Sequence, residues 1–189
     1  MNSSRRGFLL GLSGAMAGGL FACSPAKSRD DEKQKEEYDM QLRPHHILDI
    51  ISDHGQGITY QPHSYGHSLH IVAPKVLSNL DLKIKLALGT DAVCEGCKHL
   101  MPDGQCNDVL SQLKPSPSKQ AYNDVLDCRL FDYLSIENGS VMTIRQYLER
   151  VNEKVPGIEN ICTHPKENQE ERLAGLVKGL IKLDIRKQP

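Results

Sequence analysis

Three thiols lie close together in the middle of this 189-residue sequence, at Cys94, Cys97 and Cys106. The Cys-x-x-Cys spacing of the first two puts both sulfurs on one side of a tight turn. Asp103-Gly104 predicts a further turn that returns the third sulfur toward them. We therefore expect a metal-binding loop, with a fourth ligand from elsewhere in the chain, for which Cys162 is preferred.

Cys162 is preferred because it precedes a helix that is expected to begin after Pro165. The positive end of a helix dipole favours a thiolate, which is the form of cysteine that binds metal. Cys128 falls within an apolar helical pattern, where a cysteine is more often a small core residue. The residues ranked below Cys162 as metal ligands are Cys128, His45, His46, His99, His164 and Asp49.

The six cysteines also permit one or two ordinary disulfides. If Cys23 is consumed by lipidation, five of the six remain, and an odd number cannot all pair within the chain. Attachment of haem is excluded because Lys98, rather than histidine, follows the second cysteine of the pair. A thioredoxin-like pair is disfavoured because Pro102 and Gly104 predict a continuing loop where a helix should begin.

The first residues predict an export signal and a lipid anchor. The sequence around Arg5-Arg6 is close to the twin-arginine signature, and the apolar run that follows it is shorter than the roughly 20 residues that span a membrane. Residues 20–23, Leu-Phe-Ala-Cys, are typical of a bacterial lipobox with Cys23 as the acylated residue, although a plain secretory signal is the alternative. The twin-arginine route carries proteins already folded around a cofactor. We expect a protein of the bacterial cell envelope that is held to the membrane through Cys23.

The chain divides into the signal peptide (1–22), a tether (23–41) and one globular domain (42–186). The tether is densely charged and almost without apolar residues, which predicts flexibility. The formal net charge of −1 and the absence of a Lys/Arg stripe argue against nucleic-acid binding. With no tryptophan and three phenylalanines the core is modest, so a structural metal could add on the order of 10 kcal/mol to its stability.

Hydrophobic patterns predict an α+β fold that is mainly α-helical, a single small domain with a short sheet or hairpin and the Cys-rich metal-binding loop. Alternation over residues 82–88 predicts a strand that leads to Cys94. In the second expected helix His63, His67 and His70 would share one face. Helices are expected at 42–51, with a break at 54–57, at 62–80, at 116–134 opened by Ser116-Pro117, from a capping box at Thr143, and after Pro165.

Leu42-Arg43-Pro44-His45-His46-Ile47-Leu48, followed by Cys94-x-x-Cys97, Cys106 and Ile161-Cys162, resembles an uncharacterised prokaryotic family catalogued as domain of unknown function 1284. The resemblance extends over nearly all of residues 42–186. Members of that family are regarded as iron–sulfur-binding proteins, so the resemblance implies a cluster on the thiols of this chain. A cysteine commonly follows His-His-Leu-Leu in the family where this chain has Asp49, which leaves open whether Asp49 replaces a cluster ligand.

Three functions follow from these residues. The leading expectation is an exported, lipid-anchored iron–sulfur protein of electron-transfer or sensing type, which would need a redox partner protein. Its cluster ligands would be Cys94, Cys97, Cys106 and Cys162. The second is a structural zinc module on the same thiols, with His99 or His164 replacing one of them.

The third function is a metalloenzyme built on His45, His46, His63, His67 and His70 with Asp49 or Asp53. Adjacent residues of a helix point in different directions, so at most one of His45 and His46 is expected to face a given site. The sequence contains no nucleotide-binding loop, nucleophile elbow or His-Glu-x-x-His helix, and whether the protein is an enzyme is left open.

Overall fold

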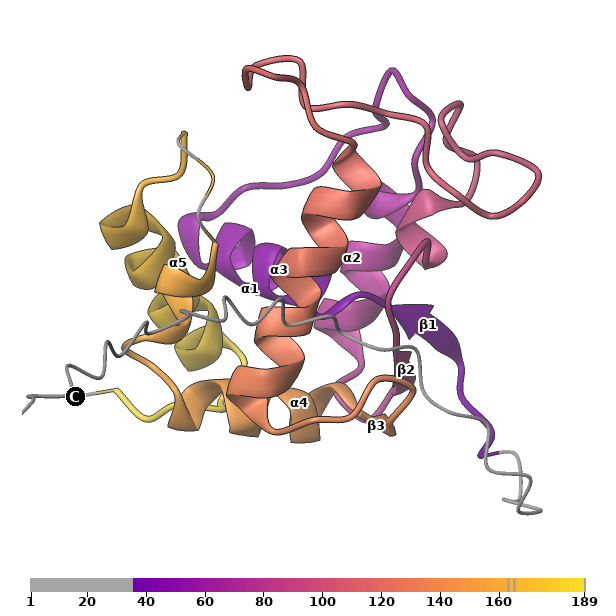
Figure 1. Cartoon of the computed structure of the whole chain (residues 1–189). Helices are drawn as coiled ribbons and strands as arrows, with labels where there is room; N and C mark the ends of the chain where they lie inside the picture. Colours follow the sequence, from indigo (N-terminus) through magenta and orange to yellow (C-terminus); the bar gives the residue numbers. More distant parts are fainter. Residues whose placement is uncertain (1–35, 163, 165, 189) are drawn as a thin grey trace, which may run out of the picture.

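Five α-helices and a small three-stranded sheet are formed by the residues that the computed structural model describes, 36–162, 164 and 166–188 (Figure 1). The expected signal peptide, Cys23 and the tether up to residue 35 lie outside these residues. In chain order the elements are β1 (Met40–Leu42), α1 (Pro44–Gln56), α2 (Leu69–Ser78), β2 (Lys83–Leu86), the 3-10 turn η1 (Ala92–Cys94), α3 (Lys119–Leu134), β3 (Val141–Thr143), α4 (Ile144–Glu153), the 3-10 turn η2 (Ile158–Ile161) and α5 (Gln169–Lys182). The expected mainly helical α+β fold with its cysteines in a loop is confirmed.

The sheet brings two distant segments of the chain together. β2 lies in the middle, parallel to β1 and antiparallel to β3, and Leu42 pairs with Leu86 at the ends of the two parallel strands. Ile84 and Leu86 are fully buried, as the alternating sequence of this strand predicts. Because parallel strands end at the same edge of a sheet, the start of α1 lies next to the segment that runs from β2 into the thiol loop, residues 94–106.

α1 starts where proline is favoured and ends where glycine is favoured. Pro44 occupies the first turn of the helix, and Gly57 caps the other end with a φ of 79°. α5 crosses α1 at close range because Gly55, Gly175 and Gly179 carry no side chains at the contact. A Cβ atom added at Gly179 would overlap the backbone carbonyl oxygen of Ile51.

α3 and α4 complete the core around α1. The side chain of Ser118 caps α3 by accepting a hydrogen bond from the backbone N–H of Ala121 at 3.3 Å. Both hydrogen bonds of the capping box expected at the start of α4, between Thr143 and Gln146, are present. Tyr147 is fully buried, and its hydroxyl donates to the carbonyl oxygen of Pro44 at 3.0 Å, which joins α4 to the first turn of α1.

Three expected helix boundaries are wrong. The helix expected from residue 62 begins at Leu69, because the chain turns at Gly66, which has a φ of 79°. His63, His67 and His70 therefore do not share a helix face, although the rings of the first two stack with centroids 4.3 Å apart. α1 continues through residues 54–56, where a break was expected, and α3 is capped by Ser118 rather than Ser116.

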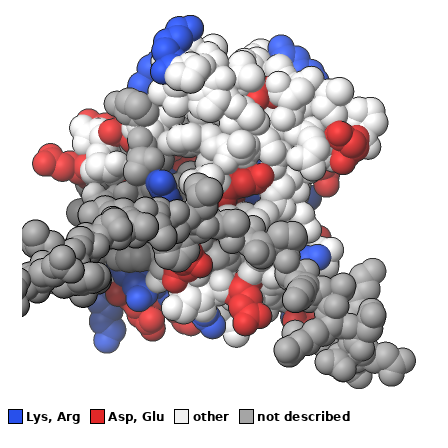
Figure 2. Space-filling model, in the orientation of Figure 1, with Lys and Arg blue, Asp and Glu red and all other residues white. Residues whose placement is uncertain are grey.

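The face drawn in Figure 2 shows no concentration of one charge. Acidic and basic side chains are scattered over the face seen in Figure 2, and neither sign forms a single patch there. Among the described residues no helix combines the length and the apolar composition that crossing a lipid bilayer requires.

Candidate metal centre

All four thiols that the sequence predicts as ligands line one cavity of about 420 Å³, and none of the four is in a disulfide. Three come from the thiol loop, and Cys162 comes from the segment between η2 and α5. Cys128, on α3, is disulfide-bonded and is not part of the cavity wall, so its place among the alternative ligands is wrong. The other residues ranked as alternative ligands all line the cavity: His45, His46, Asp49, His99 and His164.

The thiol loop is shaped by backbone hydrogen bonds between its own residues. The N–H of Cys97 donates to the carbonyl oxygen of Cys94 at 3.0 Å, which closes the turn of the Cys-x-x-Cys pair. The expected turn at Asp103-Gly104 is present, with Gly104 at a φ of 79°. It returns the chain so that Leu100 and Cys106 form an isolated antiparallel bridge. The third thiol thus reaches the same cavity wall as the first two.

A second loop, residues 58–68, supports the thiol loop from outside. The backbones of Gly66 and Gly96 touch, since a Cβ added at Gly96 would lie 2.9 Å from the carbonyl oxygen of Gly66. The N–H of Lys98 donates to the carbonyl oxygen of Tyr65 at 2.8 Å. This loop also contributes His67 to the cavity wall. Close contact between two glycines at positive φ therefore fixes where the Cys-x-x-Cys turn sits.

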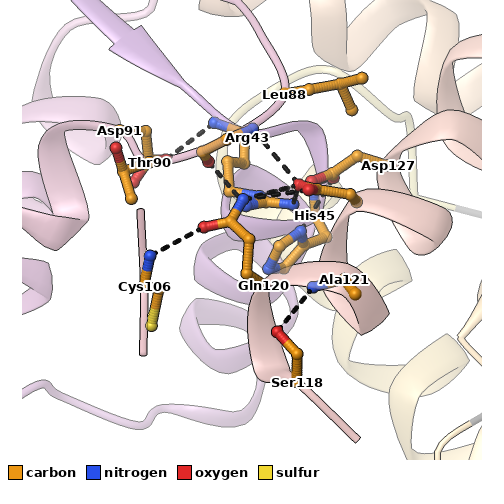
Figure 3. Close-up of polar contacts among 12 residues, drawn as sticks. Arg43, His45, Leu88, Thr90, Asp91, Cys106, Ser118, Gln120, Ala121 and Asp127 are labelled. Atoms are coloured by element: carbon orange, nitrogen blue, oxygen red, sulfur yellow. Dashed lines mark hydrogen bonds and ion pairs between the residues drawn. The ribbon is translucent and has the colours of Figure 1, made fainter. Parts of the chain in front are cut away.

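Arg43 and His45 bind the same buried carboxylate (Figure 3). Asp127 of α3 is fully buried, and its two oxygens lie 2.6 Å from Nε of Arg43 and 2.8 Å from Nδ1 of His45. Arg43 also donates to Asp124 at 2.6 Å. Burial alone would raise the pKa of Asp127, but His45 and Arg43 hold it below its ordinary value. Gln120 continues this network to the thiol loop by accepting a hydrogen bond from the N–H of Cys106 at 3.3 Å.

Asp91 connects His46 to a thiol. Its carboxylate lies 2.8 Å from Nδ1 of His46 and 3.6 Å from Sγ of Cys94, and it accepts hydrogen bonds from the N–H groups of Arg43 and Val93. Burial opposes ionisation, but His46 and these donors lower the pKa of Asp91 to about 2. Burial alone would lower the pKa of His46, whereas the charge of Asp91 raises it overall. Since a carboxylate only accepts, His46 donates through Nδ1–H, and only the neutral form of the ring has a lone pair on Nε2.

His45 and His46 both line the cavity, so the expectation that at most one of them faces a given site is wrong. Their ring centroids are 4.3 Å apart. The reason is that Asp127 and Asp91 hold the two rings by Nδ1 from different elements, α3 and the start of η1. The same carboxylates accept the N–H groups of His45 and Arg43, which caps α1 with side chains from elsewhere in the chain.

The wall around Cys162 is joined to α1 by an ion pair. Arg172 of α5 lies 2.7 Å from Asp49 and 3.4 Å from Glu167. Cys162 was expected to be a thiolate at the positive end of α5, but burial raises its pKa. The N-terminal N–H groups of α5 are capped by Asn168 instead. Burial also raises the pKa of Cys94, to about 11. Both groups are therefore thiols at neutral pH and must lose a proton to bind metal.

The remaining sequence-predicted residues are divided between the cavity and other places. Asp53 lies outside the cavity wall and accepts a hydrogen bond from the hydroxyl of Tyr60. Within the described part of the chain, no three His, Cys, Asp or Glu side chains are close enough together to hold one metal ion. The four thiols therefore share one cavity wall, but the described donors are not gathered as a single ion requires.

Sequence reasoning missed the carboxylates that hold the histidines. Asp127 belongs to no motif. The sequence feature that could have identified it is its position between the apolar residues Leu126 and Leu130, where a charged side chain is unexpected. A buried charge needs a partner, so that position indicates an ion pair within the core. Asp91 stands after the expected strand at the edge where site residues gather, but its partners are 45 to 48 residues away in the sequence.

The sequence pattern of one family, described as protein of unknown function (DUF1284), matches residues 60–166. The matched stretch contains the thiol loop and Cys162, whereas His45 and His46 precede it. It is shorter than the span of 42–186 over which the resemblance was expected. No curated protein and no solved structure gives a match.

Proposed function

This chain belongs to the DUF1284 family, and from its site we propose that it is a metal-binding protein that holds an iron–sulfur cluster and serves in electron transfer or sensing. The proposal depends on one observation, that four thiols free of disulfides line one cavity. A cluster needs four such donors. The proposed ligands are Cys94, Cys97, Cys106 and Cys162.

A cluster accepts a wider separation of its ligands than a single ion does. Tetrahedral zinc with Zn–S bonds of about 2.3 Å brings its sulfurs to within about 4 Å of one another. No three donors among the described residues are placed that closely. A cluster distributes its thiolates over several iron atoms, so its ligands stand further apart. A structural zinc site on the same thiols is the second candidate, favoured by the Cys-x-x-Cys turn, and it would require the thiol loop to contract.

The residues around the thiols would tune the centre. A bound cluster supplies a one-electron redox group, and its potential depends on burial and on hydrogen bonds near the sulfurs. Asp91 stands next to Cys94 and Gln120 holds the backbone of Cys106. We further propose that the twin-arginine signal exports the protein after the cluster is inserted, and that acyl chains on Cys23 anchor it to the membrane of the cell envelope, where a redox partner protein would meet it.

Replacing the thiols one at a time tests this proposal. In protein purified without oxygen, we expect Cys97→Ser, Cys106→Ser and Cys162→Ser each to lower the iron and sulfide content per chain several-fold, because each removes a ligand. Ser111→Ala is the control, since this residue is exposed and lies outside the cavity, and it should retain the wild-type content. Cys128 is left intact because it is disulfide-bonded. Full retention of iron and sulfide by any of the first three variants would remove that cysteine from the ligand set.

A further inference from the structure

A second group of ligands faces the cavity beside the thiols, at the first turn of α1. His45 and His46 are held by Nδ1 against Asp127 and Asp91, each at 2.8 Å, and both carboxylate groups are fully buried. Both rings make their carboxylate contacts through Nδ1, and both residues line the cavity. In its neutral form each imidazole therefore keeps its proton on Nδ1 and its lone pair on Nε2, and a metal ion that binds Nε2 displaces the second proton of the charged form.

This arrangement is the one that metal-binding histidines adopt. A histidine that ligates through one ring nitrogen almost always donates its other N–H to a carboxylate, carbonyl or water, which orients the ring and raises its basicity. The structure contains two such histidine–carboxylate pairs side by side, with ring centroids 4.3 Å apart. Asp127 binds Arg43 through one oxygen, and through the other it binds both the backbone N–H and Nδ1 of His45. The contact with the ring is additional to the capping of α1.

The fixed charges around the pair favour a cation. Five carboxylates belong to this network, and only two guanidinium groups compensate them, which leaves an excess of negative charge when both imidazoles are neutral. Arg43 binds Asp124 and Asp127, and Arg172 binds Asp49. Asp91 contacts no Lys or Arg side chain among the described residues, and its only side-chain partners are His46 and Cys94. A single divalent ion offsets most of this excess without placing two imidazolium charges next to each other.

We propose that Nε2 of His45 and Nε2 of His46 together bind one divalent transition-metal ion, separate from the four thiols. Imidazole nitrogens select ions such as Co²⁺, Zn²⁺ or Fe²⁺. No third protein ligand joins the pair in the described structure, so the other coordination positions of the ion face the cavity. Catalytic zinc sites keep one open position beside three protein ligands, so an ion held by two imidazoles alone would have at least two positions for water or a bound molecule. The site is independent of the proposed cluster.

Titration with Co²⁺ separates this site from the thiols. In a protein with all four cavity cysteines replaced by serine, we expect one Co²⁺ per chain by calorimetry, with no sulfur-to-cobalt charge-transfer band. Adding His45→Gln and His46→Gln should weaken this binding at least tenfold. His54→Gln, on the same helix but outside the cavity, is the matched control. Binding that survives both glutamine substitutions would overturn the proposal, as would its absence from a four-serine protein with a native circular dichroism spectrum.

A measurement on the wild-type protein covers the case in which the four-serine protein does not fold. Long-range ¹H–¹⁵N spectra of the imidazoles, recorded with and without one equivalent of Zn²⁺, should show Nε2 of both histidines shifting while both Nδ1 atoms keep their protons. Unshifted Nε2 signals with zinc on the thiols would overturn this site and leave the thiol centre in place. Shifted Nε2 signals with no metal on the thiols would contradict only the proposed function.

Discussion

At the scale of single residues, the carboxylates behind the cavity wall decide how the site is built. Asp91 accepts hydrogen bonds from two backbone N–H groups and contacts both His46 and Cys94. The two oxygens of the Asp91 carboxylate therefore hold the start of α1, one imidazole ring and one thiol in place. Removing it should affect stability and site geometry together.

The pKa of Asp91 predicts a loss of stability in acid. Its pKa is about 2 in the folded chain against an ordinary 3.8, so the ionised carboxylate stabilises the fold above pH 4, and this contribution is lost as the pH falls from about 4 to about 2. The difference corresponds to roughly 2 kcal/mol. We expect Asp91→Asn to lower the free energy of unfolding in urea by about this amount at pH 7, and to flatten its dependence on pH below 4.

Asp132→Asn is the control for this experiment, since that residue is exposed on α3. Its free energy of unfolding should follow the wild-type value at both pH 7 and pH 3. If Asp91→Asn and the wild type lost stability in parallel between pH 4 and pH 2, Asp91 would not have the depressed pKa that its contacts require.

The thiols could be predicted from the sequence and their partners could not. Cys94, Cys97 and Cys106 are recognisable because their spacing is local, and the turn at Asp103-Gly104 is encoded in adjacent residues. The pairing of Asp127 with His45 joins residues 82 apart, and no local rule indicates it. The thiolate expected at Cys162 failed for a related reason, because burial depends on the whole fold and outweighs the helix dipole.

At the scale of elements, the contact between α1 and α5 depends on glycine. Gly55, Gly175 and Gly179 let the two backbones approach each other, and a Cβ at Gly175 would lie 2.7 Å from the carbonyl oxygen of Ser52. This contact also holds Arg172 against Asp49, and so keeps the segment with Cys162 at the cavity.

Gly179→Ala should therefore force the two helices apart. We expect it to lower the free energy of unfolding by about 1 to 3 kcal/mol despite the better helix propensity of alanine, because an overpacked contact must shift the backbone. Lys178→Ala, on the exposed side of the same helix, should change the stability by less than about 0.5 kcal/mol. Chemical denaturation of both variants measures the difference. Equal stability of Gly179→Ala and the wild type would show that α5 can move away without cost.

Helices with local signals were predicted well. Neighbouring residues predict the capping box of Thr143 and Gln146, and Pro165 predicts that α5 begins after it. Both predictions are confirmed. The start of α2 was misplaced because Gly66 turns the chain, and its reason is tertiary: its backbone packs against Gly96 of the thiol loop. A sequence pattern does not reveal that contact.

At the scale of the whole molecule, the parallel pairing of β1 and β2 creates the cavity. It sets the first turn of α1 beside the thiol loop, and the glycine contact of α1 with α5 adds Cys162. The mainly helical α+β class could be read from the sequence, and the resemblance to DUF1284 is confirmed over residues 60–166. The common cavity could not be read from the sequence, since its wall joins residues as far apart in the chain as Arg43 and Arg172.

The most direct measurement is anaerobic purification of the protein, followed by iron, zinc and sulfide analysis and an optical spectrum of the same sample. We predict brown protein with iron and acid-labile sulfide in comparable amounts and visible absorption that bleaches on reduction, because the cavity thiols carry a cluster. Colourless protein with one zinc per chain, or with the cavity thiols joined in disulfides, would contradict the account.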